Sequence, residues 1–379
     1  MFHVVRILRR GTLGVVAGCL LLAGSGAASA KPLYQTDQPL GRGLHYLLAH
    51  QNPNGSWVPQ VGPAVTALVV KALIQAGYPA SDKPIVRAMK YIESTRGPDG
   101  GFSEQVLPNY NTCIVLSTLA IMPGKKYQHQ IKGAQKFLIS LQRVAPMKDA
   151  NGHLINKANS WYGGVGYGTG RPDLSNTSFF IQALHDSGVP ASNPAMKRAL
   201  LFVTRCQENS ETNPEPFAKG LHNGGFIYTA ANGGESQFGD TDHLSGHATL
   251  TPYGTMTYSG LKSMIYAGLT ANSPQVKAAL HWIRSHWTLN YNPGTGGSRM
   301  GLFYYYLMFT RTFRALRVST ITDINGMKHN WRHEIRSKLI SLQLKNGAWM
   351  NKWSPRWLEH VKPLVTAYSC LILEDTDKH

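Results

Sequence analysis

One short segment gathers residue types that bind metals or transfer protons. Asp240, Asp242 and His243 lie in the stretch Gly239-Asp-Thr-Asp-His-Leu-Ser-Gly-His247. Two carboxylates and two imidazoles so close together could hold a divalent metal or form an acid–base group. Gly246 argues against a helix that would place both histidines on one face. We favour an Asx-rich loop that caps backbone groups, and keep a catalytic site and a metal site as alternatives.

Two further carboxylates stand directly before apolar stretches. Asp173 lies just before Thr177, where an apolar stretch begins, so it could act as an acid or cap a helix. Glu359 is the only carboxylate between Trp349 and Thr366. It could pair with Lys362 or serve as an acid at the mouth of a cavity. Together with Asp240, Asp242 and His243, these two residues are the catalytic candidates.

Aromatic and polar side chains near these segments could line a binding cavity. Ring faces attract carbocations through cation–π interactions and also stack on sugars, although enclosed aromatics more often pack as core. Three consecutive tyrosines at 304–306 cannot all face one way on a helix, so one or two at most would line a cavity. The cavity candidates are Trp161, Tyr162, Tyr167, Asn176, His222, Asn223, Tyr253, Tyr258 and Tyr305.

These residues are positioned by a repeat that runs along the chain. Apolar helical segments that start at Thr and end at Gly recur at the same length, and the expected role of Thr is to start the helix while Gly ends it in the left-handed conformation. The segments are Thr66–Gly77, Thr177–Gly188 and Thr257–Gly268, with related ones beginning at Thr112, Gly301 and Thr366.

The repeated segments are apolar on nearly all sides, which predicts helices that are enclosed all round. The helices that precede them have a single apolar stripe, such as Met196, Ala199, Leu200 and Val203. Six enclosed helices alternating with six half-exposed ones predict an inner ring of helices inside an outer ring. The protein is therefore expected to be all-α.

The turns between the paired helices share Gln, Gly and an aromatic residue. Gln51-Asn-Pro-Asn-Gly-Ser-Trp57 joins the first pair and Gln343-Leu-Lys-Asn-Gly-Ala-Trp349 joins the last. Glycine permits a tight reversal, and the aromatic ring can fill the gap between helix ends. We expect the Gln amide to connect a helix terminus to the neighbouring turn.

Gln-x-x-x-Gly-x-Trp turns followed by Thr-Ala-Leu helices resemble the prenyltransferase and squalene-oxidase repeat of squalene–hopene cyclases, oxidosqualene cyclases and protein prenyltransferase β subunits. The resemblance extends over about residues 41–373. It implies an (α/α)6 toroid of six helix pairs around a central cavity, formed by residues 31–379 as a single domain.

The resemblance also implies where an active site would lie. The cyclases of the family protonate an alkene with an Asp-x-Asp-Asp motif just before an inner-helix Thr. Asp173 matches its first position, but Ser175 and Asn176 replace the next two carboxylates. A serine hydroxyl is too weak an acid for this step. The ligand set of the zinc-dependent prenyltransferases and the Gly-Cys-Gly-Glu-Gln motif of thioester proteins do not occur, and we predict no metal or other cofactor.

Residues 1–30 have the composition of an export signal. Arg6, Arg9 and Arg10 precede the apolar run 13–23, and small residues lead to Ala30. This pattern predicts cleavage after Ala30 and a periplasmic or secreted protein. Cys113, Cys206 and Cys370 remain in the mature chain, and their apolar context predicts buried thiols rather than a disulfide framework.

The mature chain would be strongly basic. Without the three arginines of residues 1–30, 35 basic and 20 acidic residues remain, a net charge of +15. Such a charge attracts anionic glycans or lipids and favours peripheral contact with membranes. Export makes nucleic acid an unsuitable partner. The scattered basic residues also fit ordinary solvated helix faces.

Three functions are consistent with these observations. The first is a terpenoid-cyclase-like protein that acts on or binds an isoprenoid or other hydrophobic small molecule. The second is a binding module without turnover. The third is a polysaccharide lyase that would use Arg171, His222, Asn223, Tyr253 and His243 for base catalysis and charge neutralisation.

Overall fold

The computed structural model describes residues 32–103, 106–238 and 250–377, so Asp240, Asp242 and His243 lie outside the described residues. The fold described below is that of the compact unit Pro32–His379. No helix among the described residues has the length and apolar character needed to cross a membrane.

Helices account for nearly all the regular structure in the described ranges. The α-helices are α1 (Leu33–Thr36), α2 (Gln38–Ala49), α3 (Ala64–Gln75), α4 (Lys83–Ser94), α5 (Pro108–Leu119), α6 (Gln128–Ser140), α7 (Leu174–Asp186), α8 (Pro194–Arg205), α9 (Gly254–Tyr266), α10 (Pro274–Ser285), α11 (Leu302–Leu316), α12 (Trp331–Leu342) and α13 (Lys362–Asp377). Four short 3-10 helices are η1 (Pro59–Val61), η2 (Pro216–Ala218), η3 (Ala231–Gly233) and η4 (Arg356–Leu358), and β1 (Ile321–Thr322) pairs antiparallel with β2 (Lys328–His329).

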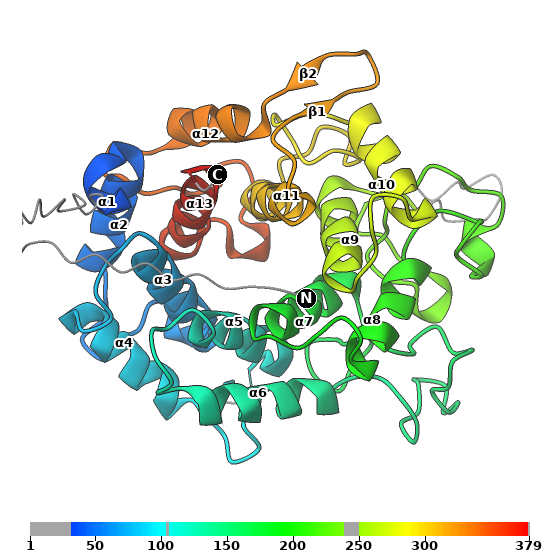
Figure 1. Ribbon diagram of the computed structural model, residues 1–379, viewed down its shortest axis with the longest axis horizontal. Coiled ribbons are helices and arrows are strands. Elements are labelled where there is room, and N and C mark those ends of the chain that lie inside the picture. The colour runs from blue at the N-terminus through cyan, green and yellow to red at the C-terminus, as the bar shows by residue number, and fades with distance from the viewer. Residues whose placement is uncertain (1–31, 104–105, 239–249, 378–379) are drawn as a thin grey trace, which may run out of the picture. The chain divides into compact units, whose positions relative to one another are not determined.

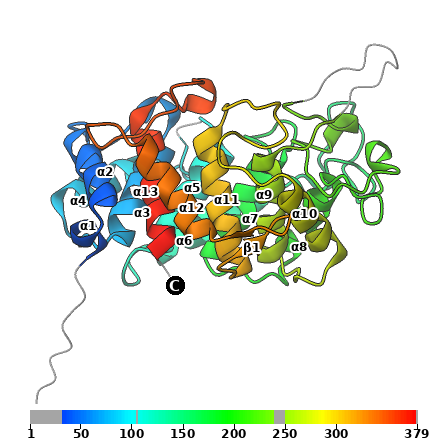
Figure 2. The ribbon, with the colours of Figure 1, turned by 90° about the horizontal axis from the view of Figure 1, so that it is seen from above.

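The longer helices form two concentric rings (Figure 1). Helices α3, α5, α7, α9, α11 and α13 each pack against the next, and α13 packs against α3 to close the inner ring. Helices α2, α4, α6, α8, α10 and α12 lie outside them, as seen for α12 over α11 and α13 in Figure 2. The expected all-α toroid of six helix pairs is therefore confirmed.

Burial differs between the rings in the way that the sequence pattern predicts. Every residue of α3 from 64 to 73 is buried. In α8, Met196, Ala199 and Val203 are buried while Lys197 is exposed. The inner helices therefore have protein on all sides, and each outer helix buries one stripe against them. Cys113, Cys206 and Cys370 are buried free thiols.

The repeated Thr does not start its helix, so that expectation is wrong. Helix α3 begins at Ala64 and α7 at Leu174, before Thr66 and Thr177. Each Thr Oγ1 instead accepts a hydrogen bond from a buried backbone N–H of the preceding turn, because that N–H would otherwise lack a partner. The bonds run from Trp57 N to Thr66 (2.9 Å), Phe102 N to Thr112 (2.9 Å), Val165 N to Thr177 (3.0 Å), Phe226 N to Thr257 (3.1 Å) and Trp349 N to Thr366 (3.0 Å).

The turn glycines allow the outer helices to approach closely. A Cβ added at Gly163, whose φ is +83°, would lie 2.0 Å from the carbonyl oxygen of Arg198 in α8. A Cβ added at Gly224 would likewise lie 2.2 Å from the carbonyl oxygen of Ala278 in α10. No side chain fits in this space. The glycines are therefore required both for their left-handed conformation and for the close contact between backbones.

The turn glutamines connect neighbouring helix pairs, as expected. Gln142 Nε2 donates to the carbonyl oxygens of Gly163 in its own turn and Ala195 in α8, each at 2.9 Å. Equivalent bonds are made by Gln51, Gln207 and Gln343. The turn is thus tied to the N-terminus of the next outer helix.

Three of these glutamines also accept a hydrogen bond from an arginine of the next outer helix. Arg198 Nε donates to Gln142 Oε1 at 2.8 Å, and Arg42 and Arg87 donate to Gln343 and Gln51. The matching position in α10 is Ala278, and among the described residues the buried Gln207 Oε1 has no partner.

We expect Ala278→Arg to stabilise the protein. The guanidinium would supply the donor that Gln207 Oε1 lacks, which should raise the free energy of unfolding by about 0.5–1.5 kcal/mol. Urea unfolding measures the change. Ala278→Met, which adds a similar stem without a donor, is the matched control, and equal stabilities of the two variants would contradict the prediction.

Candidate functional site

The inner helices point the same repeat positions toward the centre of the ring. Positions in each inner helix are numbered from its repeated Thr, and in α11, which lacks that Thr, from Tyr306. In this numbering Tyr304 is equivalent to the residue two positions before each Thr. These residues form the mouth layer: Ala64, Tyr110, Ser175, Thr255, Tyr304 and Leu364. Five of the six line one cavity. The helical period returns the same face to the centre at positions +2, +5 and +9.

The cavity, here called the aromatic chamber, lies at the N-terminal ends of the inner helices and has a volume of about 270 Å³. Loop residues such as Tyr228 and Trp357 complete its wall. No charged side chain occurs among its described lining residues. They are Val61, Val65, Leu107, Tyr110, Tyr167, Ser175, Asn176, Phe179, Tyr228, Gln237, Tyr253, Thr255, Met256, Tyr304, Trp357, Leu358, Leu364 and Tyr368.

Two hydroxyl pairs bridge helices that are not neighbours in the inner ring. Ser175 Oγ in α7 lies 2.8 Å from the Tyr304 hydroxyl in α11, and the Tyr110 hydroxyl in α5 lies 3.2 Å from that of Tyr368 in α13. Phe179 lies between them, edge-on to Tyr110 and stacked on Tyr304. These contacts hold the chamber's polar atoms in pairs and leave apolar ring surface facing the cavity.

Asp173 is a buried carboxyl beside the chamber, only 3% exposed. It caps α7: the Asn176 backbone N–H donates to Oδ1 and the Asn176 side-chain amide to Oδ2, each at 2.8 Å. Burial raises the pKa of Asp173 to about 6, against smaller opposing effects of the hydrogen bonds from Asn176 and Tyr228. The carboxyl is thus occupied by capping, and Asn176 and Tyr228 stand at the chamber wall.

Ser175 occupies the place where the resemblance implies the cyclase acid. Its side chain lines the chamber and pairs with the Tyr304 hydroxyl. The side chain at this position therefore reaches the cavity, but it is an alcohol, which is too weak an acid to protonate an alkene.

Glu359 is fully buried and serves the N-terminus of α11. Its Oε1 accepts from the Tyr304 backbone N–H at 2.7 Å, and Oε2 accepts from Asn351 Nδ2 at 2.6 Å. Burial raises the pKa of Glu359 to about 7, although these bonds favour the ionised form. The carboxylate does not line the chamber, and its position fits a helix cap.

The structure brings some of the sequence-selected residues together and separates others. Tyr167, Asn176 and Tyr253 line the chamber. Six do not: Trp161 and Tyr162 pack in a small separate cluster, His222 contacts Ser210, Asn223 contacts Glu208, and Tyr258 and Tyr305 pack in the core. Tyr305 faces away from the chamber because its neighbour Tyr304 faces it, and its hydroxyl donates to the Thr288 carbonyl at 2.7 Å.

Several chamber residues were not selected from the sequence. Tyr110 and Tyr304 belong to the mouth layer, and Phe179 and Tyr368 follow their Thr by two positions. Their spacing from the repeated Thr was therefore an available signal. Tyr228 and Trp357 lie on irregular loops, for which the repeat provides no phase. Among the described residues, no group of three His, Cys, Asp or Glu side chains could hold a metal ion.

A closed inner ring with a lined chamber at one end defines the class of α/α toroids. The sequence model of the squalene-hopene cyclase C-terminal domain matches residues 59–228, which contain α3 to α8 and the Asp173 cap. The resemblance to the squalene–hopene cyclase-like repeat family is therefore confirmed. No curated protein matches the chain in sequence.

Solved structures of several activities share the fold. A type II terpene cyclase from Scytonema, in complex with geranylgeranyl dihydroxybenzoate, is 14% identical with a TM-score of 0.50, covering 91% of this chain and 98% of its own. An α-1,6-mannanase from Salegentibacter is 9% identical with a TM-score of 0.57, covering 89% and 98%. An α-amylase from Clostridium perfringens is 10% identical with a TM-score of 0.53, covering 89% and 97%. At these identities the likeness concerns the fold alone.

The pH dependence of stability tests the Asp173 cap. A native pKa of about 6 exceeds the ordinary value, so the folded protein binds this proton more tightly than the unfolded chain. Stability due to Asp173 should fall as pH rises from about 4 to about 6, by up to about 3 kcal/mol. Asp173→Asn removes this titration. Urea unfolding of both proteins at several pH values gives the difference, which should change across this range and would be constant if the carboxyl were not buried.

Proposed function

We propose that the aromatic chamber binds a neutral isoprenoid chain and does not cyclise it by Asp-x-Asp-Asp protonation. The observation that carries this proposal is the lining itself, with eight aromatic rings and no charged side chain among the described lining residues. Such a surface favours an apolar ligand, and its paired hydroxyl and amide groups need no further partner.

The volume of the chamber limits the size of the ligand. About 270 Å³ corresponds to roughly nine water-sized groups, or about two isoprene units. Burying that many carbon groups gains about 7 kcal/mol before the cost of association. A short isoprenoid, or the end of a longer one, is therefore the ligand that the chamber fits.

The missing acid argues for binding rather than cyclisation. Asp173 is held by Asn176 as a cap, and Ser175 offers only a hydroxyl to the chamber. The rings could stabilise a carbocation, but no described group beside them is suited to create one by protonation. The Scytonema terpene cyclase binds a geranylgeranyl compound on the same fold, which supports an isoprenoid as the ligand here.

The polysaccharide-lyase alternative is not favoured. Arg171 pairs with Glu235, His222 contacts Ser210 and Asn223 contacts Glu208, so these groups have partners of their own. Of the described residues considered for that chemistry, Tyr253 lines the chamber and the other three do not. His243 lies outside the described residues.

Ligand binding can be tested with geraniol and geranylgeraniol, measured by native mass spectrometry and by quenching of intrinsic fluorescence. We expect both to bind, and Thr255→Trp to weaken binding at least tenfold because the indole fills the chamber. Thr270→Trp at an exposed turn is the matched control. Equal binding by the two variants would contradict the proposed site, and a new cyclic product in the wild-type incubation would contradict the absence of cyclisation.

We also propose that residues 1–30 direct export and that the mature protein begins at Lys31, in the periplasm or outside the cell. The basic start, short apolar run and small residues before Ala30 support this. The net charge of the remainder supports peripheral contact with an anionic surface. Expression of the full chain in a bacterium, followed by intact mass measurement, should give a product starting at Lys31. Ala30→Arg should block the cleavage, whereas a wild-type product retaining Met1 would refute the assignment.

A further inference from the structure

A second hollow lies at the opposite end of the inner ring. It has a volume of about 870 Å³ and is surrounded by the C-terminal ends of the inner helices. We call this hollow the polar bowl. The residues at position +9 of all six inner helices line it. They are Gln75, Ile121, Asp186, Tyr266, Ala315 and Asp375.

The layer at position +5 separates the bowl from the aromatic chamber. Its members are Lys71, Ser117, Gln182, Lys262, Arg311 and Leu371. Lys71, Gln182 and Arg311 line the bowl, while Lys262 lies behind Gln182 and only 5.9 Å from the Phe179 ring of the chamber. Half of the layer is cationic by residue type. This concentration of positive charge in a protein interior requires compensation.

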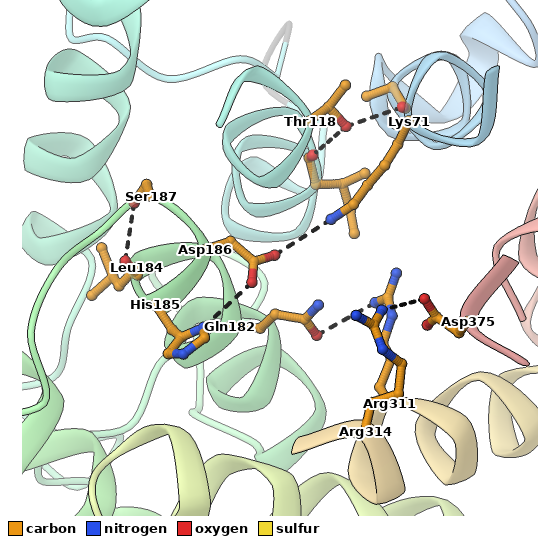
Figure 3. Close-up of polar contacts among 12 residues, drawn as sticks. Lys71, Thr118, Gln182, Leu184, His185, Asp186, Ser187, Arg311, Arg314 and Asp375 are labelled. Carbon is orange, nitrogen blue, oxygen red and sulfur yellow. Dashed lines mark hydrogen bonds and ion pairs between the residues drawn. The ribbon is translucent and has the colours of Figure 1, made fainter. Parts of the chain in front are cut away.

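The described carboxylates compensate only part of this charge. Lys71 Nζ lies 3.4 Å from Asp186 Oδ2, and Arg314 pairs with Asp375 (Figure 3). Lys262 is fully buried, and the carbonyl oxygen of the Gln182 amide accepts its hydrogen bond at 2.7 Å. Arg311, 7% exposed, donates to the same oxygen at 3.4 Å. Among the described residues neither forms a contact ion pair with a carboxylate, and Asp186 attracts both only from a longer distance.

Helix dipoles do not account for these cations. The C-terminal ends carry partial negative charge, but its effect falls off within the last turn. Lys262 is four residues from the end of α9. That end is also capped, since the N–H groups of Gly268 and Leu269 donate to the carbonyls of Ile265 and Met264. Arg314 in the last turn of α11 and Arg317 at its C-cap fit a dipole role, whereas Lys262 and Arg311 do not.

We propose that the polar bowl binds a phosphate-type oxyanion, with Arg311 and Lys71 as direct ligands and the buried amine of Lys262 behind them. The guanidinium of Arg311 lines the bowl, and its hydrogen bond to Gln182 uses one nitrogen, Nη1. Its planar fork matches phosphate oxygens in a bidentate manner. Among the lining residues of the bowl, Lys71, Arg311, Arg314 and Arg317 against Asp186 and Asp375 leave a surplus of two positive charges, which suits a dianion better than a carboxylate. The phosphate could be free or belong to a lipid headgroup.

The direct test is isothermal titration of the full-length protein with inorganic phosphate and with pyrophosphate, at ionic strength held constant with chloride. We expect saturable binding by the wild type. Arg311→Gln should weaken it at least tenfold, because a charge-assisted hydrogen bond is lost. Arg284→Gln removes the same charge from the exposed side of α10 and should bind as the wild type does. Absence of saturable binding, or equal binding by Arg311→Gln, would overturn the proposal.

A second measurement covers the case in which Arg311→Gln fails to fold. Phosphate should raise the unfolding midpoint of the wild type above that in matched chloride, and less so for Lys262→Met, which keeps the buried volume. Equal rises would refute the site. Vesicles of phosphatidylcholine with and without phosphatidic acid identify the source: binding of phosphatidic acid that inorganic phosphate displaces supports a headgroup in this bowl, and vesicle binding unaffected by phosphate opposes it.

Discussion

The hydrogen bond from a buried turn N–H to a threonine hydroxyl fixes the phase of five of the six inner helices. Five turns make this bond, at 2.9–3.1 Å. Each of these helices begins before its threonine, so the first helical turn lies on the N-terminal side of this hydrogen bond. In four of these five helices the residue two positions before the threonine lines the chamber. Rotation of one helix by a single residue, about 100°, would move every lumen residue of that helix out of line.

The same phase arranges the lumen in layers of different chemistry. Uncharged aromatic groups occupy the N-terminal end, and basic residues make up half of the layer at position +5. Lys262 lies at the boundary, with Gln182 as its hydrogen-bond partner and Phe179 beside it. Burial lowers the pKa of this amine well below its usual value. At this boundary an apolar surface meets a buried amine whose charged form is disfavoured by burial, and an anion in the bowl would favour that charged form.

The ring was predictable from sequence and the exact lumen was not. Repeated lengths from Thr to Gly, together with apolar character on all sides, are sufficient for helix number and for inner or outer position. The role of Thr66 was missed because a cap and a tether to a turn have the same sequence pattern. Tyr305 was selected in place of Tyr304, one residue and about 100° away. Glu359 is a carboxylate of the kind found in active sites, and the sequence does not reveal that the backbone N–H of Tyr304 donates to it.

Ser175 stands at the position that the family resemblance implies for the cyclase acid, but its side chain is an alcohol. The residue retains a position at the chamber wall because helix phase, set by Thr177, places it there whatever its side chain. Its hydroxyl is neutral, so it can pair with Tyr304 without a counter-charge. A carboxylate at this position would stand in an uncharged chamber close to buried Asp173, and repulsion together with desolvation would raise its pKa. An acid there would therefore need supporting donors. In this chain Asn176 gives its donors to Asp173, an arrangement that stabilises the helix cap and leaves a proton donor at position 175 unsupported.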